Sequence, residues 1–191
     1  MSQLLFDYLN QYMELTSEEQ QFITALDLFQ QFSKNDILLK EGQYTSSGYF
    51  VLKGCIRCYY LVDGEEKTTA FYTELESLEP PCVVSKKPSA YYVACVEDSI
   101  ILVSNDAIQK NSFEKFPRFE SLCRIFSEQQ LAKNQSSFDH FKTSSPEERY
   151  LHLQNTRPDL IQRVPQYQLA SYLGIKPQSL SRLRSRIAGK G

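Results

Sequence analysis

The sequence predicts an α+β chain with an antiparallel β domain, a connecting helix and a C-terminal helical domain that contains a helix-turn-helix. Three observations predict this class. Short runs rich in β-branched and aromatic residues alternate with turn residues from about Phe29 to Val103. An apolar stripe with helical spacing follows Pro117. A segment with the spacing of a helix-turn-helix occupies residues 166–183, where the charge balance of the chain has reversed.

Residues 1–26 read as helical, with a second start at Thr16, where Glu19 completes the pattern of a capping box. The strands follow, separated by turn residues. They are expected at 37–39, 49–52, 55–62, 68–72, 91–96 and 100–103. Asp63-Gly64 is a strong hairpin signal, and four glycines recur at turns, namely Gly42, Gly48, Gly54 and Gly64. These features indicate an antiparallel barrel or roll and exclude a parallel sheet.

Helical periodicity returns after Asn105, a suitable N-cap, and again after Pro117, a suitable first helical residue. A helix from about Pro117 to Asn134 aligns one apolar stripe, which consists of Phe119, Leu122, Cys123 and Phe126. We expect this stripe to form the seam of a homodimer. The alternative is that it packs on the β domain of its own chain.

The polar segment from Gln135 to Ser145 coincides with the change of charge, so the hinge between domains is expected there. A new helix is expected after it, with Ser145 as its cap and Glu148 closing a capping box, and Arg157-Pro158 ends it. The domains are therefore predicted as 1–116 for the β domain with its N-terminal helices, 117–141 for the connecting helix and hinge, and 142–191 for the helix-turn-helix domain.

The charge is divided unequally along the chain. Residues 1–141 hold 12 Lys or Arg against 20 Asp or Glu, a net charge of −8, whereas residues 142–191 hold 9 against 3, a net charge of +6. No acidic residue follows Asp159, but six basic residues do, namely Arg163, Lys176, Arg182, Arg184, Arg186 and Lys190. A basic block of this kind attracts phosphates whatever the nucleic-acid sequence, although a solvated basic tail would have the same composition.

Several classes of protein are disfavoured. The first residues lack the charged and apolar regions of a signal peptide, and no run of about 18 apolar residues could span a membrane, so we expect a cytoplasmic chain. The five scattered cysteines are expected to be reduced, and Cys55 and Cys58, three apart on a strand, face opposite sides. We expect no metal, no cofactor and no enzymatic activity, because no nucleophile-base pair or phosphate loop is recognisable, and His140 and His152 read as exposed helical residues.

Residues 166–183 carry the prediction of function. Ala170 is small where two helices would cross, and Gly174 permits the left-handed turn between them. The shared apolar contact is expected from Leu169, Leu173, Leu180 and Leu183. Pro177 fits the first turn of the second helix. An ordinary helical hairpin with an amphipathic second helix is the alternative.

The outward face of the second helix is free of acidic residues and rich in side chains that read base edges: Arg pairs with guanine, Gln with adenine, and Ser with either. We expect base contacts from Pro177, Gln178, Ser181, Arg182 and Ser185. Phosphate contacts, which set the register without reading sequence, are expected from Arg163, Lys176, Arg184 and Arg186.

The chain resembles the Crp/Fnr regulators over nearly its whole length. The resemblance rests on the turn glycines, the connecting helix and above all the segment from Arg163-Val164-Pro165-Gln166 to Leu180-Ser181-Arg182-Leu183-Arg184. It implies an N-terminal β-roll (a double-stranded β-helix of the cyclic-nucleotide-binding type), a long dimerisation helix and a winged-helix-like DNA-binding domain. The resemblance also implies a homodimer that binds a pseudo-palindromic site in double-stranded DNA, with RNA polymerase and an unidentified small-molecule effector as further partners.

The sequence departs from this family in the phosphate cassette of the members that bind cyclic AMP. Ser89-Ala90 match, but Pro88 stands in place of the arginine, whose planar fork suits two phosphate oxygens. The stretch from Phe71 to Glu79 lacks the glycine and carries three carboxylates. We therefore expect no physiological binding of cyclic AMP. Any pocket that remains is expected at Glu74, Ser89, Ala90 and Tyr91.

Together these features predict a sequence-specific DNA-binding transcription regulator that acts as a homodimer. The alternative is a ligand-binding sensor module whose C-terminal domain binds a protein partner and not DNA. A steep loss of affinity for duplex DNA with rising salt distinguishes the two.

Overall fold

The computed structural model describes residues 2–189 and divides into two compact units. The first holds the described part of Met1–Arg57 together with Phe71–Leu131. The second holds Cys58–Ala70 and the described part of Ala132–Gly191. Lys190, counted above among the basic residues, lies outside the described residues. No helix among residues 2–189 has both the length and the apolarity that crossing a bilayer requires.

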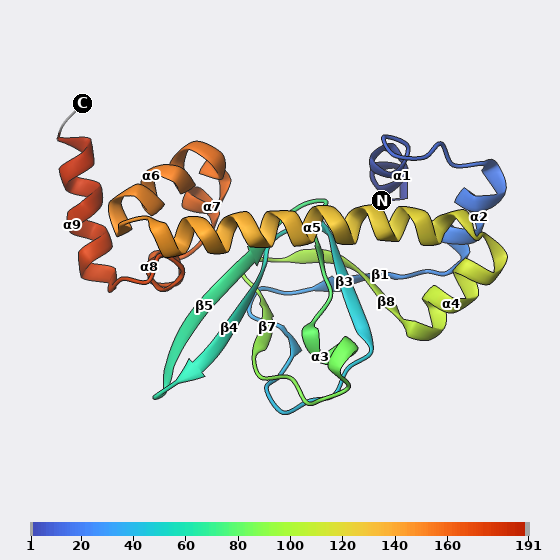
Figure 1. Ribbon diagram of the computed structural model, residues 1–191, viewed down its shortest axis with the longest axis horizontal. Helices are drawn as coiled ribbons and strands as arrows, with labels where there is room; N and C mark the ends of the chain where they lie inside the picture. The colour runs from blue at the N-terminus through green and yellow to red at the C-terminus, as the bar shows by residue number, and fades with distance from the viewer. Residues whose placement is uncertain (1, 190–191) are drawn as a thin grey trace. The chain divides into compact units, whose positions relative to one another are not determined.

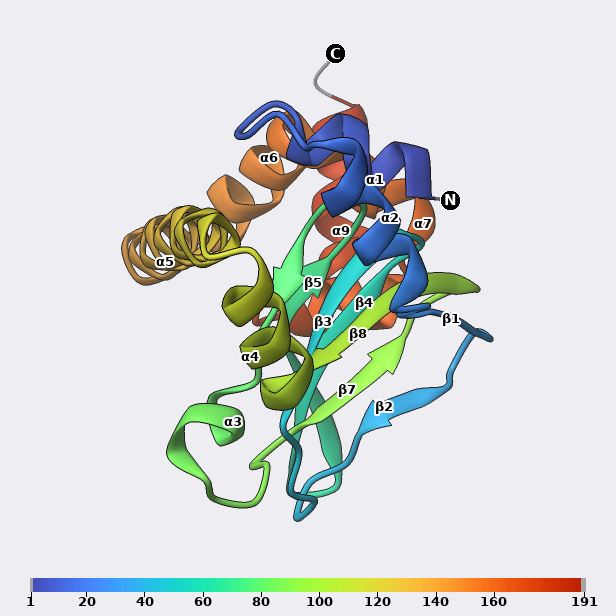
Figure 2. The same ribbon diagram turned by 90° about the vertical axis from the view of Figure 1, so that its right-hand side faces the viewer.

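The strands form two four-stranded sheets, ordered β1-β8-β3-β6 and β2-β7-β4-β5. Their bounds are Phe29–Phe32 for β1, Ile37–Leu39 for β2, Ser47–Lys53 for β3, Ile56–Val62 for β4, Glu65–Tyr72 for β5, Ser77–Leu78 for β6, Tyr92–Cys95 for β7 and Ser99–Asn105 for β8. The pairs β1–β8, β3–β8, β3–β6 and β2–β7 are antiparallel, with Phe29 opposite Leu102 and Tyr49 opposite Val103. Figure 2 shows β1, β8 and β3 side by side. The predicted antiparallel roll is confirmed.

Nine helices occur among the described residues, and Figure 1 labels them. Their bounds are Ser2–Leu9 for α1, Ser17–Ala25 for α2, Pro81–Ser85 for α3, Asp106–Lys115 for α4, Arg118–Thr143 for α5, Pro146–Thr156 for α6, Pro158–Arg163 for α7, Gln166–Tyr172 for α8 and Pro177–Ala188 for α9. Three predicted caps are confirmed, because Thr16 and Ser145 each form a complete capping box and Asn105 accepts hydrogen bonds from the first turn of α4.

The helix predicted to end near Asn134 is longer than expected, because α5 continues to Thr143, through most of the predicted hinge at 135–145. Polar side chains there support the helix instead of ending it. Gln135 Nε2 donates to Asp139 at 2.8 Å, and Thr143 Oγ1 donates to the carbonyl of Asp139 at 2.8 Å. The chain leaves the helix only before Pro146, whose ring cannot continue it.

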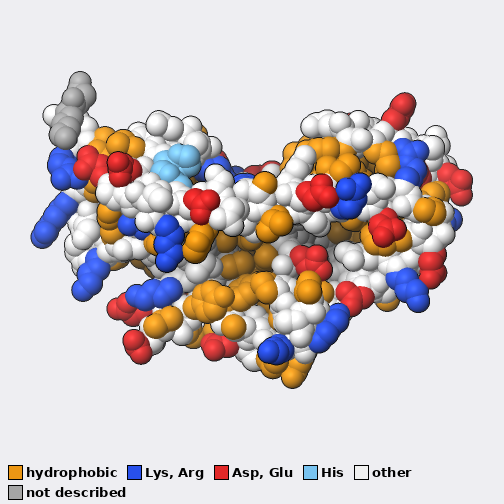
Figure 3. Space-filling model, viewed as in Figure 1, with side chains coloured by type: hydrophobic (Ala, Val, Ile, Leu, Met, Phe, Trp, Pro, Cys, Tyr) orange, Lys and Arg blue, Asp and Glu red, His pale blue; other side chains and the backbone are white. Residues whose placement is uncertain are grey.

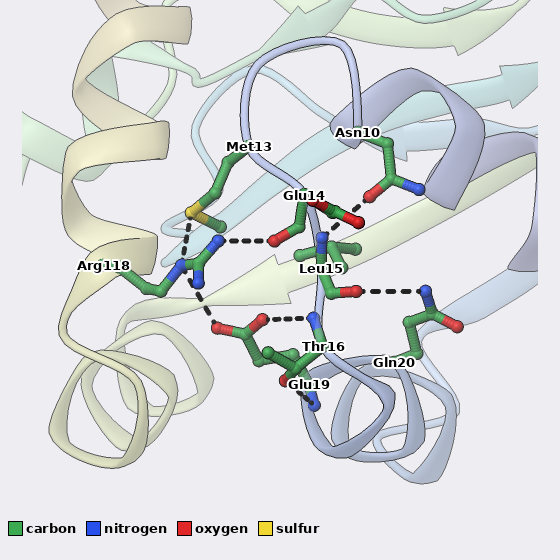
Figure 4. Close-up of polar contacts among 8 residues, drawn as sticks. All are labelled: Asn10, Met13, Glu14, Leu15, Thr16, Glu19, Gln20 and Arg118. Carbon is green, nitrogen blue, oxygen red and sulfur yellow. Dashed lines mark hydrogen bonds and ion pairs between the residues drawn. The ribbon is translucent and has the colours of Figure 1, made fainter.

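A buried apolar cluster joins the N-terminal helices to the β domain and to the start of α5 in the first unit. It consists of Leu5, Phe6, Leu9, Leu15, Leu52, Phe119 and Leu122. Polar contacts reinforce the same junction (Figure 4): the guanidinium of Arg118 donates to the sulfur of Met13 at 2.8 Å and to the carbonyl of Glu14, and it lies beside Glu19. The first helices are thus anchored by both apolar and charged contacts.

Candidate nucleic-acid interface

Helices α8 and α9 are joined by a tight turn whose geometry requires a glycine. Gly174 has a φ of +72°, in the left-handed region, and a Cβ there would lie 3.2 Å from the ring of Phe141. The turn is closed by backbone hydrogen bonds from Leu173 to Leu169 and from Ile175 to the carbonyl of Ala170, at 2.9 and 3.0 Å. This is the connection that the sequence predicts for a helix-turn-helix.

The apolar contact between the two helices is also as predicted. The four leucines expected in it are buried, namely Leu169, Leu173, Leu180 and Leu183, and so is the small Ala170. Pro177 occupies the first turn of α9, with Lys176 as the N-cap. Since leucines three residues apart lock one side of α9 against α8, the opposite side of α9 is held in a fixed orientation.

The side chains predicted to contact bases lie on that opposite side and are exposed: Pro177, Gln178, Ser181, Arg182 and Ser185. Ser185 Oγ donates to the carbonyl of Ser181 at 3.1 Å, so its hydroxyl is oriented along the helix. Within residues 2–189 the Arg182 guanidinium makes no ion pair or side-chain hydrogen bond. Arg182 is therefore free to bind an external acceptor from the middle of this face.

The four residues predicted to contact phosphates differ in their surroundings. Lys176, Arg184 and Arg186 are exposed on or next to α9, where Lys and Arg side chains gather on the face drawn in Figure 3. Arg186 pairs with Glu147, and Arg184 Nη1 donates to Gln166 Oε1. Arg163, at the end of α7, is partly buried and lies 3.9 Å from Asp159. Arg163 is thus the least available of the four.

The structure also adds contacts within the second unit that the sequence reasoning missed. The guanidinium of Arg149 stacks on the ring of Phe141, 4.2 Å from its centroid, directly behind the turn at Gly174. The rings of His140 and His152, two residues expected to be exposed on helices, lie with their centroids 4.2 Å apart. Both contacts join the end of α5 to the helices after it, and no local pattern in the sequence signals either one.

The residues predicted to line a ligand pocket are engaged by the protein itself. Ser89 Oγ donates to the carbonyl of Tyr91 at 2.7 Å and accepts from its amide at 3.3 Å. Glu74 Oε1 accepts from the amide of Gly54 at 2.8 Å. Ser89 and Tyr91 are buried, whereas Ala90 is exposed.

The stripe predicted as a dimer seam belongs mainly to the chain's own core, so the prediction is wrong for Phe119 and Leu122. Both are buried in the apolar cluster of the first unit. The ring of Phe126 stacks on Tyr8 and meets Tyr12 edge-on, with centroids 5.5 and 5.0 Å apart. Cys123 is exposed. Helical periodicity marked a buried face correctly, and this face packs against α1 and the β domain of the same chain.

The remaining four cysteines are buried thiols. Burial raises the pKa of Cys58 to about 12 and that of Cys95 to about 11, so both are protonated near neutral pH. Among residues 2–189, no three His, Cys, Asp or Glu side chains are placed together so that they could hold a metal ion.

Known proteins resemble this chain in sequence and in fold. Residues 29–116 match the family model described as "Cyclic nucleotide-binding domain". No curated protein sequence matches the chain. Among solved structures, FixK2 from Bradyrhizobium japonicum is 15% identical with a TM-score of 0.68, over 85% of each chain.

A CooA mutant from Carboxydothermus hydrogenoformans is 20% identical with a TM-score of 0.68, over 88% of this chain and 80% of that one. TTHB099 from Thermus thermophilus, described as a transcriptional regulator of the CRP family, is 14% identical with a TM-score of 0.63, over 85% of each chain. The chain therefore has the fold of the Crp/Fnr regulators, with a domain of the cyclic nucleotide-binding type over residues 29–116.

Proposed function

We propose that the chain is a sequence-specific DNA-binding transcription regulator that acts as a homodimer in the cytoplasm and has no enzymatic activity. One observation carries this proposal: α9 is locked to α8 by buried leucines while Gln178, Ser181 and Arg182 lie exposed on its other side. A helix with such a face, free of carboxylates, fits the major groove. The fold that it shares with regulators such as TTHB099 supports the same function.

Within this proposal Pro177, Gln178, Ser181, Arg182 and Ser185 contact base edges. Phosphate contacts come from Lys176, Arg184 and Arg186. Arg163 also contacts a phosphate once its ion pair with Asp159 is broken. Gln166 supports this set, because its side-chain oxygen accepts from Arg184 and so restricts where that guanidinium points.

The homodimer is proposed along α5, but on residues other than those first predicted. Leu131 and Phe138 are exposed by 70% and 56% and lie seven residues apart, which puts them on the same face of the helix. A second copy of α5 would cover both side chains. A dimer of this kind presents two copies of α9 to two half-sites.

The β domain is proposed to act without cyclic AMP. Pro88 stands in place of the arginine, and the hydroxyl of Ser89 and the carboxylate of Glu74 already bind backbone groups of the chain. Calorimetric titration is expected to show no binding of cyclic AMP in the micromolar range. An unidentified small-molecule effector and RNA polymerase complete the proposed partners.

The function is tested by selecting genomic DNA fragments on the immobilised protein and measuring affinity for the recovered site. A DNA-binding regulator loses affinity steeply as salt rises from about 50 to 200 mM, and it still prefers the selected site when competitor DNA is present. Failure to retain any duplex at the lower salt concentration contradicts the proposal and favours a C-terminal domain that binds a protein partner.

A further inference from the structure

A hydroxyl group on α8 binds two backbone groups of the β4–β5 hairpin. The outer part of the hairpin, Cys58–Ala70, belongs to the same compact unit as α8 and α9. Ser171, on α8, donates from Oγ to the carbonyl of Glu66 at 2.8 Å. The same oxygen accepts from the amide of Thr68 at 2.9 Å. We call this pair of hydrogen bonds the Ser171 clasp.

The clasp uses the free edge of a sheet. Strand β5 is the last strand in the order β2-β7-β4-β5, so its outer backbone groups have no neighbouring strand. On an extended strand the carbonyl of one residue and the amide of the second residue after it point the same way, as those of Glu66 and Thr68 do here. The Ser171 hydroxyl fills the place that an added strand would take, and Thr68, whose amide it binds, is buried.

The clasped hairpin is acidic where it meets the helix-turn-helix. Its turn and the start of β5 carry Asp63, Glu65 and Glu66, against a single basic residue, Lys67, which pairs with Glu65. The pKa of the Glu65 carboxyl is lowered chiefly by Lys67 and in a smaller part by the charge of Lys176. Lys176 is the N-cap of α9. The carboxylate of Glu65 therefore lies within electrostatic range of the end of α9 that enters the groove in helix-turn-helix proteins.

We propose that the β4–β5 hairpin acts as a latch that inhibits DNA binding by the helix-turn-helix. The Ser171 clasp closes this latch, and binding of DNA with full affinity requires that the hairpin be released. The inference rests on the proposed DNA-binding function. In the clasped state a phosphate that approaches Lys176 also meets the field of Glu65 and the neighbouring carboxylates. Charges repel one another over a screening length of about 8 Å at physiological salt, so these carboxylates oppose the phosphate. Release of the hairpin removes them and leaves Lys176 to the DNA.

The first test compares two variants with the wild type in fluorescence anisotropy titrations of a selected duplex. Ser171→Ala opens the clasp, and we expect it to bind the duplex several-fold more tightly. Glu65→Gln keeps the clasp and removes a charge, so we expect a smaller gain that shrinks as salt rises. Thr156→Ala is the matched control, since its hydroxyl donates only within α6, to the carbonyl of His152, and its affinity should equal that of the wild type.

A structural role for the clasp gives the opposite result. If the hydroxyl only supports α8, Ser171→Ala weakens DNA binding and lowers the unfolding midpoint, which overturns the latch. Unchanged affinity in both hairpin variants, with normal binding by the wild type, also rejects the latch but leaves the DNA-binding function intact. Absence of binding by the wild type and by Ser171→Ala at about 50 mM salt rejects the function itself.

Hydrogen exchange gives a second readout that does not depend on affinity. The amide of Thr68 is protected by the clasp, so exchange of peptides from 58–70 should be faster in Ser171→Ala than in the wild type. Adding saturating duplex to the wild type should accelerate exchange in the same peptides. Slower or unchanged exchange there in the DNA complex contradicts release of the hairpin.

Discussion

The Nε atom of Arg118, at the start of α5, lies 3.4 Å from a carboxylate oxygen of Glu19, on α2. The carboxylate is almost fully buried, and its other oxygen accepts from the amide of Thr16 at 2.8 Å. One side chain therefore both caps α2 and holds the N-terminal helices to the helix on which the dimer is proposed to form.

Replacing Glu19 should destabilise the protein measurably. We expect Glu19→Ala to lower the free energy of unfolding by about 2 kcal/mol, because a capping box is lost and the guanidinium of Arg118 loses its anionic partner. Glu19→Gln keeps an oxygen for Thr16 and should lose less. Urea denaturation followed by circular dichroism measures both, and equal stability of Glu19→Ala and the wild type would reject the structural role.

The turn at Gly174 should tolerate a side chain poorly. Gly174→Ala places a Cβ at a φ of +72° and 3.2 Å from the Phe141 ring, and we expect a loss of about 2 kcal/mol together with weaker DNA binding. Gly64→Ala is the control for backbone strain alone, since its φ is +78° and its Cβ would meet nothing within 4 Å. Thermal unfolding should therefore rank Gly174→Ala below Gly64→Ala, and the reverse order would contradict the packing argument.

The cysteines should differ sharply in reactivity. Cys123 is exposed, whereas burial raises the pKa of Cys58 to about 12, so the native protein should be alkylated at Cys123 first. Burial and the charge of Glu79 also raise the pKa of Cys123, so its rate should still be increasing above pH 9. Mass spectrometry of tryptic peptides after iodoacetamide treatment measures this. Alkylation of Cys58 at neutral pH without denaturant would contradict the structure.

The raised pKa of Cys58 determines how the stability of the protein changes with pH. The folded state keeps this thiol protonated up to about pH 12, whereas an unfolded chain loses the proton near pH 9. The unfolded state thus binds fewer protons in that window, and stability falls as the pH rises from 9 toward 12. Cys58→Ala should show a shallower fall over the same range.

The proposed seam on α5 is tested by charge insertion. Leu131→Asp combined with Phe138→Asp should convert a dimer into a monomer in analytical ultracentrifugation, because two carboxylates would be buried against a second copy. Ser136→Asp is the control, since it adds a carboxylate at an exposed position away from that face. A dimer that survives the double substitution would place the interface elsewhere.

Local signals in the sequence predicted local structure well. Thr16 with Glu19 and Ser145 with Glu148 form the expected capping boxes, because each needs only four consecutive residues. Asp63 and Gly64 both have positive φ angles, as a tight hairpin turn demands. The helix-turn-helix followed from the same kind of short-range pattern.

Contacts between distant segments could not be predicted from the sequence. The stripe containing Phe119 and Leu122 indicated a buried face. Its periodicity does not reveal whether α1 or a second chain packs on that face. The clasp of Ser171 joins residues more than 100 positions apart, and a single serine on a helix gives no sign of it. The helix through 135–143 was missed because its Ser and Thr residues were read as a linker, although Pro146 is the first residue that prevents its continuation.

In the proposed function, α9 reads base edges through Arg182. The most direct test is the ratio of affinities for a selected site and its scrambled version, measured for the wild type, Arg182→Ala and Arg186→Ala. We expect Arg182→Ala to lose about 1–3 kcal/mol on the selected site and little on the scrambled one, so that the ratio falls. Arg186→Ala should weaken both duplexes alike and reduce the salt slope by about 1. Equal losses on both duplexes for Arg182→Ala would contradict the account.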